Sequence, residues 1–389
     1  MVMEPIPYSC QNVNDDDIAA VVAALRSDYL TQGPAVPAFE TAFAARHGVA
    51  HAVAVSNATA GLHIACLALG VGRGKRVWTS PNSFVASANC AIYCGALVDF
   101  VDIDPLTRNM SVEALTDKLR QAASVGTLPD LLIPVHFAGL PCDLQAMRAL
   151  ADHYGFRILE DASHATGASY QGQPVGSAWV DASVFSFHAV KVLTTGEGGM
   201  VTTPDPALAR RLQLLRSHGI TRDAAELQTD SPGAWYYEQQ SLGFNHRMTD
   251  VQAALGLSQL QRLQSWHDRR AILADHYHRQ LADLPLLLPI QPADRVSAWH
   301  LYAVEIDAAR TSVGRAQVFQ ALRDARIGVN VHYIPIHLQP YYAAMGFAPG
   351  QFPAAERYYA RALSLPLFPA MTEAQQQRVV DTLRAALDA

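Results

Sequence analysis

Residues 185–199 read FSFHAVKVLTTGEGG and place Lys191 just after a short apolar run. Such a run is typical of a buried strand. A lysine in this position is unusual, because burial lowers the pKa of an amine and leaves it nucleophilic, as Schiff-base chemistry requires. Most lysines are solvated surface groups, so Lys191 taken alone is better explained in that way.

Short apolar runs and helical patterns alternate on both sides of this segment. The runs cover residues 52–55, 97–103, 131–137, 157–159 and 183–187. Continuous apolar strands separated by helices indicate an α/β sheet that is covered on both faces. We therefore expect a large α/β domain over residues 1–250. Its first helix starts after the cap Asn14 and carries Ile18, Val21, Val22 and Leu25 on one face.

A smaller unit is expected over residues 251–389. The stretch 249–281 is strongly helical, and a helix of this length commonly connects domains. The pattern beyond it predicts a small α+β domain with strands at 299–306 and 328–332. A helix over 313–326, capped by Ser312, is expected between these strands, and a second helix over 372–387 is expected at the C-terminus.

Composition excludes several classes of protein. Half of the 389 residues are hydrophobic and 16% are charged, so the chain can bury a large core and is not disordered. The net charge of −6 provides no excess of positive charge of the kind that binds nucleic acid or an anionic membrane. The five cysteines are sparse and odd in number, which argues against a disulfide scaffold. Without an apolar run of about 20 residues or a signal segment, a cytoplasmic protein is expected.

The turn between the run 52–55 and the next helix reads VSNATAG over residues 55–61. Its small residues, Ala58 and Thr59 among them, let the N–H groups of a helix N-terminus approach a phosphate. The helix dipole favours that anion, and the Thr59 hydroxyl adds a donor. A capped turn without a ligand is the simpler alternative, and this segment alone does not exclude it.

Residues 159–164 read LEDASH and put Glu160 and Asp161 at the end of a buried strand. Open α/β sheets bind their ligands at this edge. A carboxylate there can hold a proton on a heteroaromatic nitrogen. An aspartate that caps the following turn explains the segment equally well.

Three other patterns suggest ligands but have simpler explanations. Asp102-Ile103-Asp104 resembles the metal-binding Asp-x-Asp of nucleotide-sugar glycosyltransferases, yet Pro105 favours a turn at the end of a strand. His332 and His337 have no third ligand nearby, so we expect no metal site. Residues 70–75 resemble a phosphate loop but follow a helix and have the wrong spacing.

In this order, the three segments around Ala58, Asp161 and Lys191 resemble the sugar-nucleotide aminotransferases of the DegT/DnrJ/StrS type, which use pyridoxal 5′-phosphate (PLP). The resemblance extends from residues 29–34 (YLTQGP) to residues 364–367 (SLPL). It implies the aspartate-aminotransferase fold, PLP-dependent transferase fold type I. This fold has a large mixed α/β/α domain and a small α+β C-terminal domain.

The resemblance implies catalytic roles for three residues. Lys191 matches the lysine that binds PLP as a Schiff base and moves the proton. Asp161 matches the carboxylate on the pyridine nitrogen, and His164 matches a position beside the phenolic oxygen. Related dehydratases replace the lysine, so the presence of Lys191 disfavours a dehydratase.

The remaining matches concern how the cofactor is held. Ala58, Thr59 and Ser186 match phosphate-binding positions, and Phe84 matches the aromatic residue that stacks on the ring. Asn245 matches a residue that the other subunit contributes to the phosphate. The resemblance therefore implies a homodimer with shared active sites, whereas an Asn245 that caps the next helix is the local alternative.

Further segments resemble one subgroup, the UDP-4-amino-4,6-dideoxy-N-acetyl-β-L-altrosamine transaminases of pseudaminic acid biosynthesis. Among them are residues 134–139 (PVHFAG), 216–223 (RSHGITRD) and 331–335 (VHYIP), and one departure is Ala189 in place of proline. The subgroup implies L-glutamate as amino donor. It implies UDP-2-acetamido-2,6-dideoxy-β-L-arabino-hexos-4-ulose, a UDP-linked 4-keto-6-deoxy-hexosamine, as acceptor.

Several alternatives stay open at this point. A relative could aminate another 4-keto sugar, such as the D-xylo epimer of bacillosamine- or legionaminic-acid-type pathways. A glycosyltransferase could use Asp102 and Asp104 with a metal, and a non-catalytic regulatory protein could share the fold. Candidates for the diphosphate are Arg222, Arg247, His332 and the region of His218, with a surface salt bridge as the alternative for each arginine.

Overall fold

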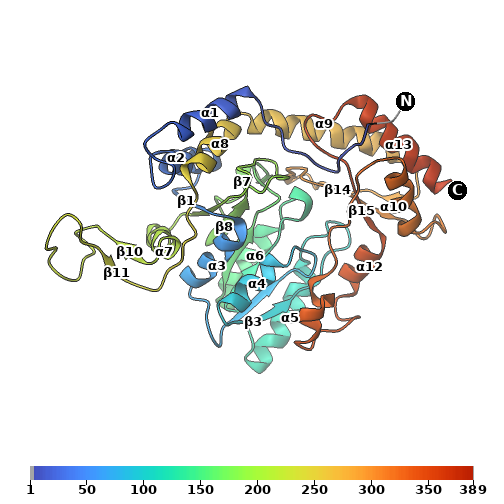
Figure 1. Ribbon diagram of the computed structural model, residues 1–389. Coiled ribbons are helices and arrows are strands. Elements are labelled where there is room, and N and C mark those ends of the chain that lie inside the picture. Colours follow the sequence, from blue (N-terminus) through green and yellow to red (C-terminus); the bar gives the residue numbers. More distant parts are fainter. Residues whose placement is uncertain (1–3, 389) are drawn as a thin grey trace.

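The structure, a computed structural model, describes residues 4–388. Its centre is a seven-stranded mixed sheet with the order β1-β9-β8-β5-β4-β2-β3 (Figure 1). Strands β3, β2, β4, β5 and β8 are parallel, β9 is antiparallel to β8, and β1 is antiparallel to β9. The predicted α/β sheet is confirmed. The bounds are β1 His51–Val55, β2 Arg76–Thr79, β3 Leu97–Phe100, β4 Leu131–Ile133, β5 Arg157–Asp161, β8 Ala182–Ser186 and β9 Gly199–Thr203.

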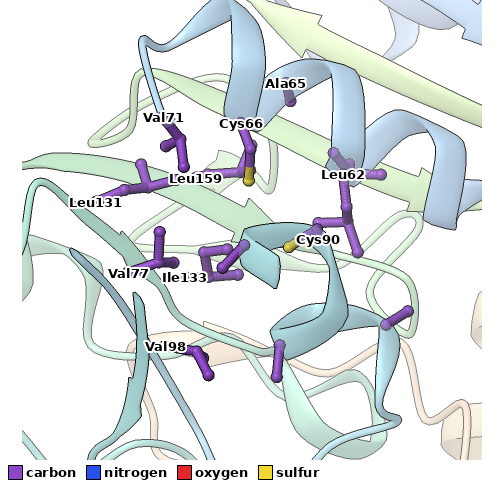
Figure 2. Packing of buried hydrophobic residues seen from close by; sticks show 14 of the residues in the cluster. Leu62, Ala65, Cys66, Val71, Val77, Cys90, Val98, Leu131, Ile133 and Leu159 are labelled. Carbon is purple, nitrogen blue, oxygen red and sulfur yellow. The ribbon is translucent and has the colours of Figure 1, made fainter. Parts of the chain in front are cut away.

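Helices cover both faces of this sheet. Val53 and Val55 of β1 belong to the core under α3 (Ala58–Ala68), α4 (Ala86–Tyr93) and α7 (Pro206–Arg216). Ala52 and Ala54 point to the other face and pack with α2 (Ala35–His47) and α8 (Asp250–Leu260). The same face continues over α5 (Val112–Val125) and α6 (Leu144–Tyr154). Figure 2 shows the first core, in which Leu62, Cys66 and Cys90 of the helices meet Val77, Leu131 and Leu159 of the strands.

Helix α1 (Asp15–Leu25) begins after the predicted cap Asn14. Its predicted apolar face, however, is only partly covered by this chain, because Val21 and Val22 are partly buried. Ile18 and Leu25 are 54% and 56% exposed, whereas Asp17 is buried. The Asp17 carboxylate accepts hydrogen bonds from Ser258 and Gln259 of α8, and these contacts fix the orientation of the helix.

The single helix predicted over residues 249–281 is wrong, because the structure has two. Thr249 caps α8, and a second helix, α9, covers Leu263–Leu281. Arg262 leaves the helical path at the junction, and its guanidinium forms an ion pair with the buried Asp17. The division of the chain at residue 250 stays a prediction.

The C-terminal part contains a three-stranded antiparallel sheet, β12-β14-β15, packed with α10 and α13. Two predictions here are wrong. Residues 328–332 form no strand, because Asn330 makes only an isolated bridge to Ser364. The cap of α10 is Gly314, whose N–H donates to the Gln317 side chain, and not Ser312. The bounds are β12 Leu286–Leu287, β14 Tyr302–Ile306, β15 Ala362–Leu365, α10 Arg315–Asp324, α12 Pro353–Arg361 and α13 Glu373–Leu387.

A hairpin of β10 (Ile220–Thr221) and β11 (Glu238–Gln239) projects from the body beside α7 (Figure 1). The shorter elements are β6 Ser169–Tyr170, β7 Gln173–Pro174, β13 Arg295–Val296, η1 Phe137–Gly139, η2 Ile336–Leu338 and α11 Pro340–Ala343. No helix in residues 4–388 has both the length and the apolar character needed to cross a membrane.

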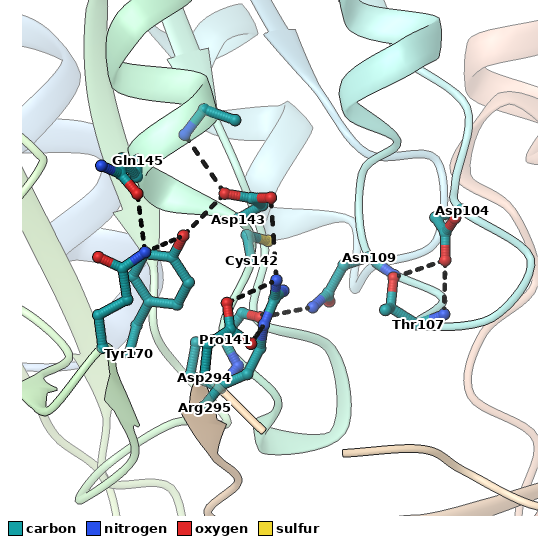
Figure 3. Close-up of polar contacts among 12 residues, drawn as sticks. Asp104, Thr107, Asn109, Pro141, Cys142, Asp143, Gln145, Tyr170, Asp294 and Arg295 are labelled. Carbon is teal, nitrogen blue, oxygen red and sulfur yellow. Dashed lines mark hydrogen bonds and ion pairs between the residues drawn. The ribbon is translucent and has the colours of Figure 1, made fainter. Parts of the chain in front are cut away.

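Arg295 joins the segment before β14 to the sheet, as Figure 3 shows. Its guanidinium donates to the Pro141 carbonyl at 3.0 Å and lies over the Tyr170 ring. The Tyr170 hydroxyl donates to Asp143 at 2.8 Å, and Asn109 donates to the same Pro141 carbonyl at 3.2 Å. These bonds fix the loop that follows β4, at the edge where the predicted site residues gather.

Candidate active site

A cavity of about 620 Å³ lies beside the carboxyl ends of β5 and β8 and the N-terminus of α3. Seven of the eight predicted site residues line it, namely Ala58, Thr59, Phe84, Asp161, His164, Ser186 and Lys191. The eighth, Asn245, does not line the cavity of this chain and forms an isolated bridge with Ser217. The cap of the next helix is Thr249, so the capping alternative for Asn245 is wrong.

One end of the cavity is built to receive an anion. Asn57 caps α3 by accepting a hydrogen bond from the Ala60 N–H at 2.8 Å. The N–H groups of Ala58 and Thr59 have no acceptor among the hydrogen bonds of residues 4–388, and they lie at the positive end of the helix dipole. Gly199 permits this arrangement, because a Cβ there would lie 2.8 Å from the Ala58 nitrogen.

Asp161 ends β5 and is 5% exposed. The Ser87 hydroxyl donates to its Oδ2 at 2.6 Å, and the Ser163 N–H donates to its Oδ1 at 3.1 Å. Its backbone is also fixed, because its N–H donates to the Pro134 carbonyl and its carbonyl accepts from the His136 N–H. The carboxylate is therefore held in one orientation at the wall of the cavity.

Lys191 follows β8 in a tight turn, in which its N–H donates to the His188 carbonyl at 2.9 Å. The Thr195 N–H donates to the Phe187 carbonyl and closes the loop behind it. Burial lowers the pKa of the Lys191 amine to about 8, although the nearby Asp161 carboxylate acts in the opposite direction. The amine can therefore lose its proton close to neutral pH and act as a nucleophile or base.

Three histidines, His164, His300 and His332, line the cavity, and all are held neutral. Burial and the charge of Lys191 lower the pKa values of His164 and His300 well below the ordinary value, and that of His332 to about 4. The Tyr333 hydroxyl lies 3.1 Å from His164 Nε2. The pKa of Tyr333 is raised by burial, so its phenol keeps its proton.

Several cavity residues were not assigned from the sequence. Tyr8, Asn57, Ser83, Ser163, His188, Glu197, His300 and Tyr333 all line the cavity. Tyr333 stood inside the matched segment 331–335, whereas Tyr8 carried no signal that could have singled it out. The candidate diphosphate ligands Arg222 and Arg247 lie outside the cavity, where Arg222 lies over the Tyr237 ring and Arg247 donates to Ser217.

The two carboxylates of the Asp-x-Asp pattern accept hydrogen bonds from backbone N–H groups. Asp102 accepts from the N–H groups of Ala354 and Ala355 at the start of α12. Asp104 accepts from the N–H of Thr107 in its own turn. No cluster of three potential metal ligands occurs within residues 4–388. The glycosyltransferase alternative therefore has no structural support in the described part of the chain.

These donors fit an aromatic phosphate with a basic ring nitrogen. The unpaired N–H groups and the Ser186 hydroxyl can donate hydrogen bonds to a phosphate. The Asp161 carboxylate can accept a hydrogen bond from a protonated ring nitrogen, and the Lys191 amine can attack an aldehyde carbon. Phe84, which is 59% exposed, offers a ring face at the cavity wall. PLP carries all of these groups, so the cavity fits PLP.

Comparison with known proteins gives the same result. The model of the DegT/DnrJ/EryC1/StrS aminotransferase family matches residues 11–384. The chain is 41% identical over 382 residues to the spore coat polysaccharide biosynthesis protein SpsC of Bacillus subtilis, which covers 97% of this chain and 96% of SpsC.

Two solved structures resemble the whole chain. Spr1654 of Streptococcus pneumoniae, named as a sugar aminotransferase and solved in its PMP form, has a TM-score of 0.90 at 28% identity. The match covers 98% of this chain and 99% of Spr1654. PseC of Helicobacter pylori, an aminotransferase involved in the biosynthesis of pseudoaminic acid, has a TM-score of 0.88 at 29% identity, over 99% of this chain and 100% of PseC.

Proposed function

Because this chain belongs to the DegT/DnrJ/EryC1/StrS aminotransferase family, we propose that it transfers an amino group from L-glutamate to C4 of a UDP-linked 4-keto-6-deoxy-hexosamine. The family and the structural neighbours give the broader activity directly. The protein is a PLP-dependent sugar aminotransferase with the type I fold expected from its sequence. The proposal concerns the residues, the substrates and the assembly.

The observation that carries the proposal is the arrangement of Lys191, Asp161 and the N-terminus of α3 around one cavity. In it, Lys191 would hold the cofactor covalently, Asp161 would hold a proton on the ring nitrogen, and Phe84 would stack on the ring. The N–H groups of Ala58 and Thr59 and the Ser186 hydroxyl would hold the phosphate. PLP, when bound, withdraws electrons from the carbon that carries the amino group, so that this carbon can release a proton.

The chain's own side chains would then manage protons and orientation. Lys191 Nζ, with a pKa of about 8, would take the proton from that carbon and return it on the other side of the reaction. His164 would stay neutral and contribute a hydrogen bond beside the phenolic oxygen rather than a charge. Donor and acceptor would use the same cavity in turn, because one set of contacts serves both half-reactions.

A homodimer is part of the proposal. The described residues that line the cavity include no arginine, and Lys191 is the only strongly basic side chain among them. Glutamate and the UDP diphosphate are anions and need cationic partners. The projecting hairpin carries Arg222 together with the exposed Trp235, and α1 exposes Ile18 and Leu25. Exposed apolar surface of this kind marks interaction sites, which supports a second subunit that completes the cavity and supplies Asn245.

The favoured acceptor is UDP-2-acetamido-2,6-dideoxy-β-L-arabino-hexos-4-ulose, as in pseudaminic acid biosynthesis. The likeness to PseC over nearly the whole chain supports this choice. A second candidate is another nucleotide-linked 4-keto-6-deoxy sugar, because SpsC is 41% identical and is named for spore coat polysaccharide biosynthesis. The two candidates differ in the sugar and share the chemistry.

The test is the visible spectrum of one half-reaction. The purified protein is converted to its pyridoxamine form with L-glutamate and is then mixed separately with the L-arabino and the D-xylo 4-keto UDP sugars. The PLP absorbance should return with the L-arabino sugar only. Its return with the D-xylo sugar only would assign the protein to the second candidate. Failure of L-glutamate to produce the pyridoxamine form would contradict the proposed donor.

The dimer is tested by mixing two variants. Lys191→Ala and Asn245→Ala homodimers should each have little activity. Exchange of subunits should restore part of it, because one shared site then contains both native residues. No recovery after proven exchange would contradict the contribution of Asn245 across the interface.

A further inference from the structure

Two buried serines stand behind Asp161 in the first turn of α4 and the residues before it. Ser87 Oγ lies 2.6 Å from Asp161 Oδ2, and Ser83 Oγ lies 2.7 Å from Ser87 Oγ. All three side chains are buried, and Ser83 and Asp161 also line the cavity. The hydroxyls therefore form a continuous chain that ends on the carboxylate.

The directions of these hydrogen bonds follow from the donors that are available. An ionised carboxylate only accepts hydrogen bonds, so Ser87 gives its single proton to Asp161. Ser83 must then donate to Ser87, since Ser87 has no second proton to give. The carbonyl of Phe84 lies 3.4 Å from Ser87 Oγ and is a poorer acceptor than the carboxylate at 2.6 Å.

We propose that Ser87, supported by Ser83, is a positioning residue that keeps the Asp161 carboxylate aimed at the ring nitrogen of PLP. The Ser87 hydroxyl and the Ser163 N–H are the donors that hold the two carboxylate oxygens. A rotation of the carboxylate would leave these donors unpaired, so they fix its direction. This inference rests on the proposed role of Asp161.

Glu160, which precedes Asp161 on β5, and Ser183 on the neighbouring β8 provide a matched control. Ser183 is buried like Ser87, and its hydroxyl donates to the carboxylate of Glu160, the residue before Asp161. Glu160 does not line the cavity, and its carboxylate faces Ser183 and His136. Ser87→Ala and Ser183→Ala each remove one buried hydroxyl from one buried carboxylate, but only the first carboxylate faces the cofactor.

The experiment measures binding of two cofactors to the apoprotein. One is PLP, and the other is a PLP analogue in which a carbon replaces the ring nitrogen. Ser87→Ala should weaken binding of PLP by about tenfold or more, which is the usual scale for a hydrogen bond to a charged group. It should leave binding of the analogue unchanged, because the analogue gives Asp161 no nitrogen to hold. Ser83→Ala should act in the same direction with a smaller factor.

The control variants interpret the result. Ser183→Ala should bind PLP like the parent protein, and thermal unfolding of each apoprotein reports whether it is folded. Equal weakening of PLP and analogue by Ser87→Ala, or no weakening of either, would overturn the inference. Asp161→Asn distinguishes the proposed role of Asp161 from the proposed role of the two serines. If it binds PLP like the parent, the role of Asp161 itself is wrong. If only Asp161→Asn loses affinity, the serine chain alone is wrong.

Discussion

The Tyr333 hydroxyl lies 3.1 Å from Nε2 of His164, although 169 residues separate the two in the chain. The bond joins the C-terminal part of the protein to the loop after β5. The bond gives Nε2 of His164 its hydrogen-bond partner. The other ring nitrogen, Nδ1, is buried and has no partner among the described residues.

Replacing Tyr333 with phenylalanine should lower the free energy of unfolding of the apoprotein by about 1–3 kcal/mol, since a buried nitrogen of His164 then loses its partner. Chemical denaturation measures this. Tyr358→Phe is the control, because the buried Tyr358 hydroxyl has no partner in the described structure and its removal should cost nothing. Equal losses in both variants would show that the bond to His164 does not matter.

Gly199→Ala should damage the anion-binding end of the cavity. The new Cβ would lie 2.8 Å from the Ala58 nitrogen and 2.9 Å from the Phe185 carbonyl oxygen, and both are backbone atoms. Overpacking of this kind costs about 1–3 kcal/mol of stability, and it displaces the N–H groups proposed to bind phosphate. Titration of the apoprotein with PLP should show weaker binding. Gly72→Ala is the control, because its Cβ would meet no atom within 4 Å.

The ion pair of Arg108 with Glu305 should be costly to break on one side only. Both side chains are buried, and Arg108 Nε donates to Glu305 Oε1 at 2.8 Å. Arg108→Met leaves a buried carboxylate without its partner, so a loss of about 3–5 kcal/mol in unfolding free energy is expected. The double variant with Glu305→Met should recover much of that loss. A double variant as unstable as the single one would contradict the explanation.

The stability of the apoprotein should fall as the pH falls from about 6.5 towards 4. Burial lowers the pKa of His47, His267 and His332 to about 4 in the folded protein. In the unfolded chain each histidine takes up a proton near the ordinary histidine pKa of about 6.5. Acid therefore favours unfolding by up to about 1.4 kcal/mol per pH unit for each histidine. Denaturation at a series of pH values measures the slope. His47→Gln, at a residue that does not line the cavity, should make the slope smaller by about one proton, and an unchanged slope would contradict this.

Asp102 should matter for stability and not for metal binding. Its carboxylate accepts from two N–H groups at the start of α12, so Asp102→Ala should cost about 0.5–2 kcal/mol, the usual value of a helix cap. Transamination should continue in the presence of EDTA at the same rate. A loss of activity that a divalent cation restores would revive the Asp-x-Asp alternative.

Local sequence patterns predicted most of the elements. The cap Asn14, the strand 52–55, the helix after it and the C-terminal helix are all present, because each depends on neighbours within a few residues. Asp161 and Lys191 were singled out by the resemblance of their segments to one family, and the structure places both at the cavity.

Contacts between distant segments were beyond such patterns. Nothing near Ser87 in the sequence indicates that it faces Asp161, and nothing near Arg262 indicates that it forms an ion pair with Asp17. The sequence favoured a turn at Asp102 over a metal site, but it could not show that the start of α12 donates to this carboxylate. The pattern placed Ile18 and Leu25 on one apolar face of α1, but a periodic pattern does not show what covers that face, and the structure leaves both side chains exposed.

The sequence by itself therefore determined the family and with it the kind of chemistry, because the segments around Ala58, Asp161 and Lys191 together resemble sugar-nucleotide aminotransferases, and the family model matches residues 11–384. Only the tertiary structure decided how these groups are held. The chain from Ser83 to Asp161, the close approach of Gly199 to α3 and the bond from Tyr333 to His164 all join segments that topology alone brings together.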